Sequence, residues 1–99
     1  MSHNEQALYE NVLSEMADDY ESFEYLLEHS QRWATQKGES VTRDAVAAVL
    51  GRAIREGNAK AYLFSPQPPH SQAVEFSLDR IDDLWFYVTP KGKEFVAQL

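Results

Sequence analysis

Ten residues decide the fold of this 99-residue chain: LWFYVTPKGK, from Leu84 to Lys93. The first five are aromatic, aliphatic or β-branched, which is typical of a strand. Thr89 and Pro90 then form a helix start, because threonine caps a first turn and proline at the first helical position loses no hydrogen bond. The stretch therefore predicts a strand over 84–88 that leads directly into a short helix over about 90–98.

A second strand is predicted over about 60–65, antiparallel to the first, because KAYLF in this segment has strand-forming composition. The prolines that follow cannot donate to a central ladder, so we expect a loop from 66 to about 72. The segment 73–83 is ambiguous. Its first four residues fit a short strand, whereas its last six fit one helical turn.

Three helices are predicted ahead of these strands, over about 5–17, 18–36 and 42–57, because apolar residues recur there at steps of three and four. The segment Asp18–Glu21 fits a capping box and marks the start of the second helix. Thr42 is in the position of an N-cap for the third. One glycine, Gly38, follows the second helix, and another, Gly57, closes the third.

Length and composition indicate one small domain. With 43% hydrophobic residues, the chain can form one modest core without a metal or disulfide. It contains no cysteine, which excludes disulfides, thiolate zinc sites and cysteine nucleophiles. The first residues lack the features of a signal peptide, and no stretch approaches the roughly 20 apolar residues of a membrane span. We therefore expect a soluble cytoplasmic protein that does not bind membranes.

Charge is distributed unevenly along this acidic chain, whose formal net charge is −7. Residues 5–28 carry eight acidic and no basic side chains, whereas residues 32–60 carry six basic and three acidic ones. Nucleic-acid binding draws most of its affinity from lysine and arginine side chains on phosphates. The net charge argues against such binding, and the basic middle segment keeps it open.

The order of three helices, a strand, a loop and a second strand resembles the winged helix domains of bacterial transcriptional regulators. The run Phe86–Lys93 is similar to the strand-and-helix junction of the multiple-antibiotic-resistance and phenolic-acid-regulator families. Thr42–Gly57 is similar to their recognition helix. The resemblance covers roughly residues 8–97. It implies an α+β winged helix-turn-helix fold for the single domain 1–99: a three-helix bundle with a β-hairpin wing, formed by the strands 60–65 and 84–88, and a short C-terminal helix.

The resemblance also implies that the third helix enters the major groove of DNA and that the wing touches the backbone or the minor groove. The leading hypothesis is therefore a regulator-like protein that binds DNA weakly or only as a dimer. Six basic side chains are candidate phosphate contacts: Arg43, Arg52, Arg55, Arg80, Lys91 and Lys93.

The surface of the third helix suits base reading poorly. On a helical wheel its outward stripe is Asp44, Ala48, Gly51 and Arg55, which offers one acid and two residues that cannot reach a base edge. Ala47, Ala48 and Gly51 form a patch of small residues on which another helix can pack. The second hypothesis is a non-DNA-binding interaction module that binds itself or another protein through this patch or through the acidic helices. Alternatively, the two alanines simply favour a solvated helix.

The aromatic residues of the strands allow two interpretations. Alternation along the strand 84–88 places Leu84, Phe86 and Val88 on one face, which we expect in the core. Trp85 and Tyr87, together with a tyrosine at position 62, lie on the other face. They either cover helix edges or form an exposed aromatic patch for a partner.

Patterns typical of catalysis and metal binding are missing from the sequence. His3, His29 and His70 stand at spacings that match no metal motif, so we expect structural or surface roles for them. There is also no glycine-rich phosphate loop and no nucleophile motif. We therefore expect neither an enzyme nor a bound cofactor or metal.

Overall fold

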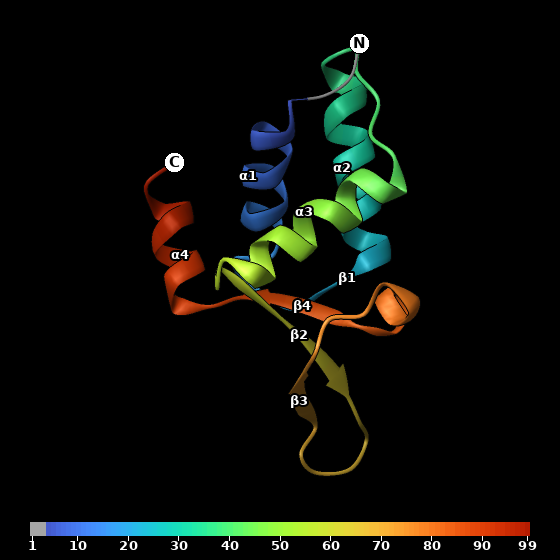
Figure 1. The fold of residues 1–99 in the computed structure, drawn as a ribbon, viewed down its shortest axis with the longest axis vertical. Helices are drawn as coiled ribbons and strands as arrows, with labels where there is room; N and C mark the ends of the chain where they lie inside the picture. Colours follow the sequence, from blue (N-terminus) through green and yellow to red (C-terminus); the bar gives the residue numbers. More distant parts are fainter. Residues whose placement is uncertain (1–3) are drawn as a thin grey trace.

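The computed structural model describes residues 4–99 (Figure 1). The protein is a mixed α+β structure in which three helices lie on one side of an antiparallel sheet, and a hairpin extends away from them. In chain order the elements are α1 (Glu5–Glu15), β1 (Glu21–Ser22), α2 (Phe23–Gln36), α3 (Arg43–Arg55), β2 (Ala59–Phe64), β3 (Ser71–Val74), the 3-10 helix η1 (Leu78–Asp83), β4 (Trp85–Val88) and α4 (Pro90–Ala97).

The sheet has four strands in the order β1-β4-β2-β3. The central pair, β2 with β4, is antiparallel and runs from Ala59 opposite Val88 to Tyr62 opposite Trp85. This pairing confirms the predicted contact between the segments 60–64 and 84–88. The strand β3 pairs with β2 to make the projecting hairpin, and β1 pairs with the other edge of β4. The segment 84–88 is therefore not the second strand of the hairpin, as predicted for the wing, because β4 lies inside the sheet between β1 and β2.

The predicted start of the second helix is wrong. The capping box at Asp18 is not used, and α2 begins at Phe23, where the Ser22 hydroxyl accepts a hydrogen bond from the Tyr25 amide at 3.1 Å. Residues 21–22 instead pair with β4, because tertiary strand pairing overrides a local cap preference. The helix α1 also ends earlier than predicted, at Glu15.

The two threonine caps are confirmed. The Thr42 hydroxyl accepts from the Ala45 amide at 3.1 Å, and the Thr89 hydroxyl accepts from the Gly92 amide at 3.1 Å. In the ambiguous segment, a strand and a helical turn both form, but β3 begins at Ser71, two residues before the segment. The predicted loop 66–72 is correspondingly shorter, because its last residues pair with β2.

One core lies between the helices and the sheet. Leu84, Phe86 and Val88 are buried in it, as their alternation predicts. The helices contribute other fully buried side chains, among them Leu8, Leu13, Met16, Phe23, Leu26, Val46 and Leu50.

The run Lys91-Gly92-Lys93 opens α4, although cations and glycine are poor choices for a first helical turn. The structure gives the reason. Gly92 is buried against the backbone of Asn58, and a Cβ at this position would overlap the Asn58 carbonyl oxygen. The Lys91 ammonium donates to the Glu56 carbonyl at 2.6 Å and so caps the end of α3. The first turn of α4 is therefore adapted to docking on α3.

Candidate functional site

Two of the three arginines predicted to contact phosphate on α3 have carboxylate partners within the chain. Arg43 pairs with Asp82 of η1 at 2.7 Å, and its guanidinium lies over the Phe23 ring at 4.7 Å. Arg52 pairs with Glu56 at 3.0 Å. Phosphate contact by either arginine would compete with an existing ion pair.

Arg52 belongs to a polar cluster that joins the end of α3 to α1. Its guanidinium lies 3.9 Å from the ring centroid of Tyr9, and the Tyr9 hydroxyl donates to Glu56 at 2.8 Å. The Asn58 side-chain amide donates in turn to the Tyr9 oxygen at 2.9 Å. Burial raises the pKa of Tyr9 above its usual value, whereas the hydrogen bonds from Tyr9 and then Arg52 lower the pKa of Glu56. The contacts of Arg52 with Tyr9 and Glu56 join α3 to α1, so the role of Arg52 is structural.

The other candidate phosphate contacts are spread over several elements. Lys91 caps α3, and the Lys93 ammonium lies over the Tyr87 ring at 5.1 Å from its centroid. Arg80 is exposed on η1. Arg43 and Arg52 stand near opposite ends of α3, so the six basic side chains do not form one compact group.

The small-residue patch on α3 is partly covered by the chain itself. Gly51 and Ala47 are buried, and only Ala48 is exposed. The ring of Phe76 lies over Gly51, where an added Cβ would stand 3.6 Å from its nearest ring atom. The predicted outward position of Gly51 is therefore wrong, because the segment between β3 and η1 crosses this face.

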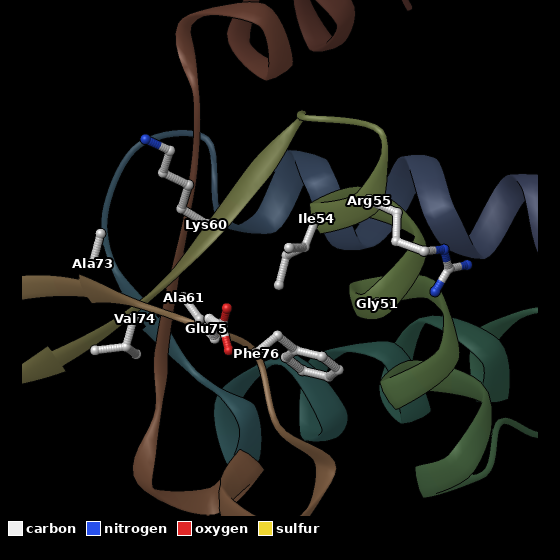
Figure 2. A pocket seen from close by; sticks show the side chains of 9 residues that line it. All are labelled: Gly51, Ile54, Arg55, Lys60, Ala61, Ala73, Val74, Glu75 and Phe76. Carbon is white, nitrogen blue, oxygen red and sulfur yellow. The ribbon is translucent and has the colours of Figure 1, made fainter.

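An open cavity of about 540 Å³ lies between α3 and the base of the β2–β3 hairpin (Figure 2). Its walls are mainly apolar. Figure 2 shows Ile54 projecting from α3 into its centre, with Arg55 and Lys60 pointing away from each other at opposite sides. The full lining is Gly51, Ile54, Arg55, Lys60, Ala61, Ala73, Val74, Glu75 and Phe76.

The opposite face of the sheet carries five aromatic side chains, which we call the aromatic face: Tyr20, Tyr62, Phe64, Trp85 and Tyr87. Their rings are neighbours, with centroids 4.9–5.0 Å apart for the pairs Tyr20–Tyr62, Tyr20–Phe64, Tyr20–Tyr87 and Phe64–Trp85. Four are half-buried and Phe64 is 44% exposed. Because Ala59 and Ala61 of β2 face the core, the alternating Tyr62 and Phe64 face away from the helices. The geometry lies between the two interpretations, because the rings lie beside one another and all but Phe64 are half-buried.

The aromatic face contains a hollow of about 380 Å³ at its α4 end. Tyrosine rings and Pro90 form its apolar wall, and the side chains of Lys60 and Lys93 also line it. The hollow therefore combines flat apolar surfaces with two cationic groups.

The positions of two residues on these surfaces were not predicted from the sequence. Tyr20 joins the aromatic face through β1, a strand of two residues that is too short to show alternation. Phe76 closes over α3 from a segment without regular structure, and nothing in its local pattern indicates that contact. The length of the loop between β2 and β3 does not indicate the contacts of Tyr20 or Phe76 either.

No protein-family model matches the chain, and no curated protein or solved structure does so either. The resemblance to regulator families therefore stays a prediction.

The part of the chain that the structure describes holds neither a group of metal-ligating side chains nor a membrane-spanning helix. Among residues 4–99, no three or more His, Asp or Glu side chains are grouped so that they could hold a metal ion. His3 lies outside these residues, so its expected role has no structural counterpart. None of the helices in this part of the chain is long and apolar enough to cross a membrane.

Proposed function

We infer that the chain is a winged helix domain that binds a partner protein through its aromatic face. The order of the elements supports this architecture. In that order, α2 and α3 correspond to a helix-turn-helix pair, and the β2–β3 hairpin corresponds to a wing. The aromatic face carries the inference of binding. Five adjacent, incompletely covered aromatic rings are the surface composition of protein interfaces, in which tyrosine, tryptophan and phenylalanine are enriched.

Binding of duplex DNA through α3 has less support. Arg43 and Arg52 are engaged in ion pairs, Gly51 lies beneath Phe76, and the net charge is −7. A negative protein repels the phosphate backbone at long range. DNA binding stays a prediction that a direct measurement decides.

The chemistry of the hollow favours an extended segment of the partner that contains proline and acidic residues. Proline-rich segments dock in grooves lined by aromatic rings, because their stiff backbone loses little entropy on binding. Lys60 and Lys93 line the hollow and would pair with carboxylates of such a segment. Short-range pairing outweighs the overall charge, since salt screens charges beyond about 8 Å at physiological ionic strength.

The binding test is an NMR titration with the synthetic octapeptide PPEPPEPP, using PPKPPKPP and PPQPPQPP as matched peptides. We expect saturable shifts at Tyr20, Tyr62 and Tyr87 with the acidic peptide, and weaker binding with the other two. Lys60→Gln should reduce the affinity, whereas Lys37→Gln, a lysine stacked on Trp33 outside the hollow, should not. Equal affinity for all three peptides, or shifts outside the aromatic face, would contradict the proposed partner chemistry.

The DNA test is a salt series with random duplex DNA. We expect no binding at low salt even at high micromolar protein concentration. Binding that weakens steeply with salt and is lost in Arg55→Glu would support the regulator hypothesis instead. Arg55 suits this substitution because no ion pair within residues 4–99 engages it.

A further inference from the structure

We propose that the cavity between α3 and the hairpin base is a binding site for a monocarboxylate with an apolar body. This site is separate from the aromatic face, and the inference does not rest on the proposed partner protein. The residues on which it depends are Ile54, Arg55, Ala61, Val74 and Phe76.

The cavity exists because β3 leaves the sheet early. The strand pairs with β2 only as far as Val74 opposite Ala61. Two residues later Phe76 packs on α3 beside Gly51, and this divergence opens a space between β2 and the helix. Its volume of about 540 Å³ lies within the range of small-molecule sites, which is about 300–1,000 Å³.

The walls select an apolar ligand body. Ile54 of α3, Ala61 of β2, Val74 of β3 and the ring of Phe76 approach the space from different elements (Figure 2). Ala61 is buried, and the other three side chains are half-buried. A ligand here would cover partly exposed apolar surface, which is the main source of affinity in such cavities.

Arg55 selects the charged group of the ligand. Within the described chain, the ion pairs of α3 engage Arg43 and Arg52 but not Arg55. One guanidinium nitrogen of Arg55 would lie 3.4 Å from a Cβ added at Gly51, a residue of the cavity wall, and Figure 2 shows this side chain at the outer rim of the cavity. A planar guanidinium binds a carboxylate through two parallel hydrogen bonds, which a lysine cannot reproduce.

The remaining charges of the cavity limit the ligand to one carboxylate. Lys60 stands on the aromatic side of β2, opposite Tyr87, and its ammonium points away from Arg55. Glu75 also lines the cavity, and its carboxylate would repel a second negative group on the ligand. The site therefore suits an acid whose other end is uncharged.

The test uses the full chain and the probe decanoate, followed by isothermal titration calorimetry and NMR. Decanol and decylamine are matched probes that have the same chain but no negative charge. We expect saturable binding of decanoate with shifts at Ile54, Val74 and Phe76, and binding at least about tenfold weaker for both matched probes.

Three variants define the site. Arg55→Gln should weaken decanoate binding by about tenfold or more, whereas Arg32→Gln, which removes the same charge from an exposed position of α2 outside the cavity, should change it less than about twofold. Ile54→Trp fills the centre of the cavity and should abolish binding; the NMR spectrum of each variant establishes that it is folded. Equal losses in Arg55→Gln and Arg32→Gln, equal binding of decanol, or the absence of saturable binding would each overturn the proposal.

Discussion

The helix α3 has two contrasting neighbourhoods, one closed and one open. At its C-terminal end, which we call the closed junction, α4 docks so tightly that Gly92 meets the Asn58 backbone, and the Tyr9 hydroxyl bonds to both Glu56 and Asn58. One turn earlier, beside Gly51, the hairpin base stands away from the helix and leaves the open cavity. The comparison shows that a small domain can pack one end of a helix tightly and leave an open cavity beside it.

The largest expected effect is that of Gly92→Ala at the closed junction. A Cβ at this position would overlap the Asn58 carbonyl, so one of the two backbones would have to shift. We expect a loss of about 3 kcal/mol or more in the free energy of unfolding, which urea denaturation would measure. A loss below 1 kcal/mol would mean that the junction is looser than described.

The second effect concerns the buried hydroxyl of Tyr9. Tyr9→Phe removes the donor to Glu56 and the acceptor for the Asn58 side-chain amide, and it leaves a buried amide without a partner. We expect a loss of about 2 kcal/mol in the free energy of unfolding. Tyr25→Phe is the matched control, because its hydroxyl contacts two incompletely buried carboxylates, Glu15 at 3.5 Å and Glu21, and no buried amide. Equal losses in the two variants would show that the cluster adds nothing.

The third prediction has the opposite sign and concerns the open cavity. Gly51→Ala places a Cβ 3.4 Å from the flexible Arg55 side chain and 3.6 Å from Phe76, which are ordinary contacts. Alanine also favours a helix over glycine, so we expect a gain of up to about 1 kcal/mol in urea denaturation. Destabilisation would indicate that Phe76 packs on Gly51 as tightly as Asn58 packs on Gly92.

The smallest effect is a pH dependence at the closed junction. The pKa of Glu56 is lowered from its usual 4.5, so the unfolded chain binds a proton there more readily than the folded one. Its contribution to stability is therefore complete above pH 4.5 and is lost as the pH falls through the lower folded pKa. In Glu56→Gln, the fall of stability with acidification should be shallower than in the wild type. Parallel stability curves would exclude this contribution.

Sequence patterns predicted local caps and the central strand pair better than contacts between distant segments, including those of the closed junction and of the open cavity. Thr42 and Thr89 are local caps, and a strand-forming run predicts its own conformation, so both helix starts and the central strand pair follow from neighbouring residues. The start of α2 was missed, because the choice between Asp18 and Ser22 depends on pairing with β4. A local helix-capping preference does not depend on a strand more than sixty positions away in the sequence.

The candidate surfaces were less predictable for the same reason. The wheel of α3 identifies Gly51 as outward, but only tertiary structure places Phe76 over it. The strand period assigns Trp85 and Tyr87 to one face and leaves open whether another element covers them. Tyr20 completes that face from a separate segment of the chain.

The docking of α4 has a consequence for the order of folding. Its opening Pro-Lys-Gly-Lys is a weak nucleus, since glycine and two cations disfavour an isolated first turn. The glycine and Lys91 become advantageous only when the Asn58 turn and the last carbonyls of α3 are already in position. We therefore expect this helix to assemble last, on a preformed template, and a peptide comprising it alone to remain a random coil.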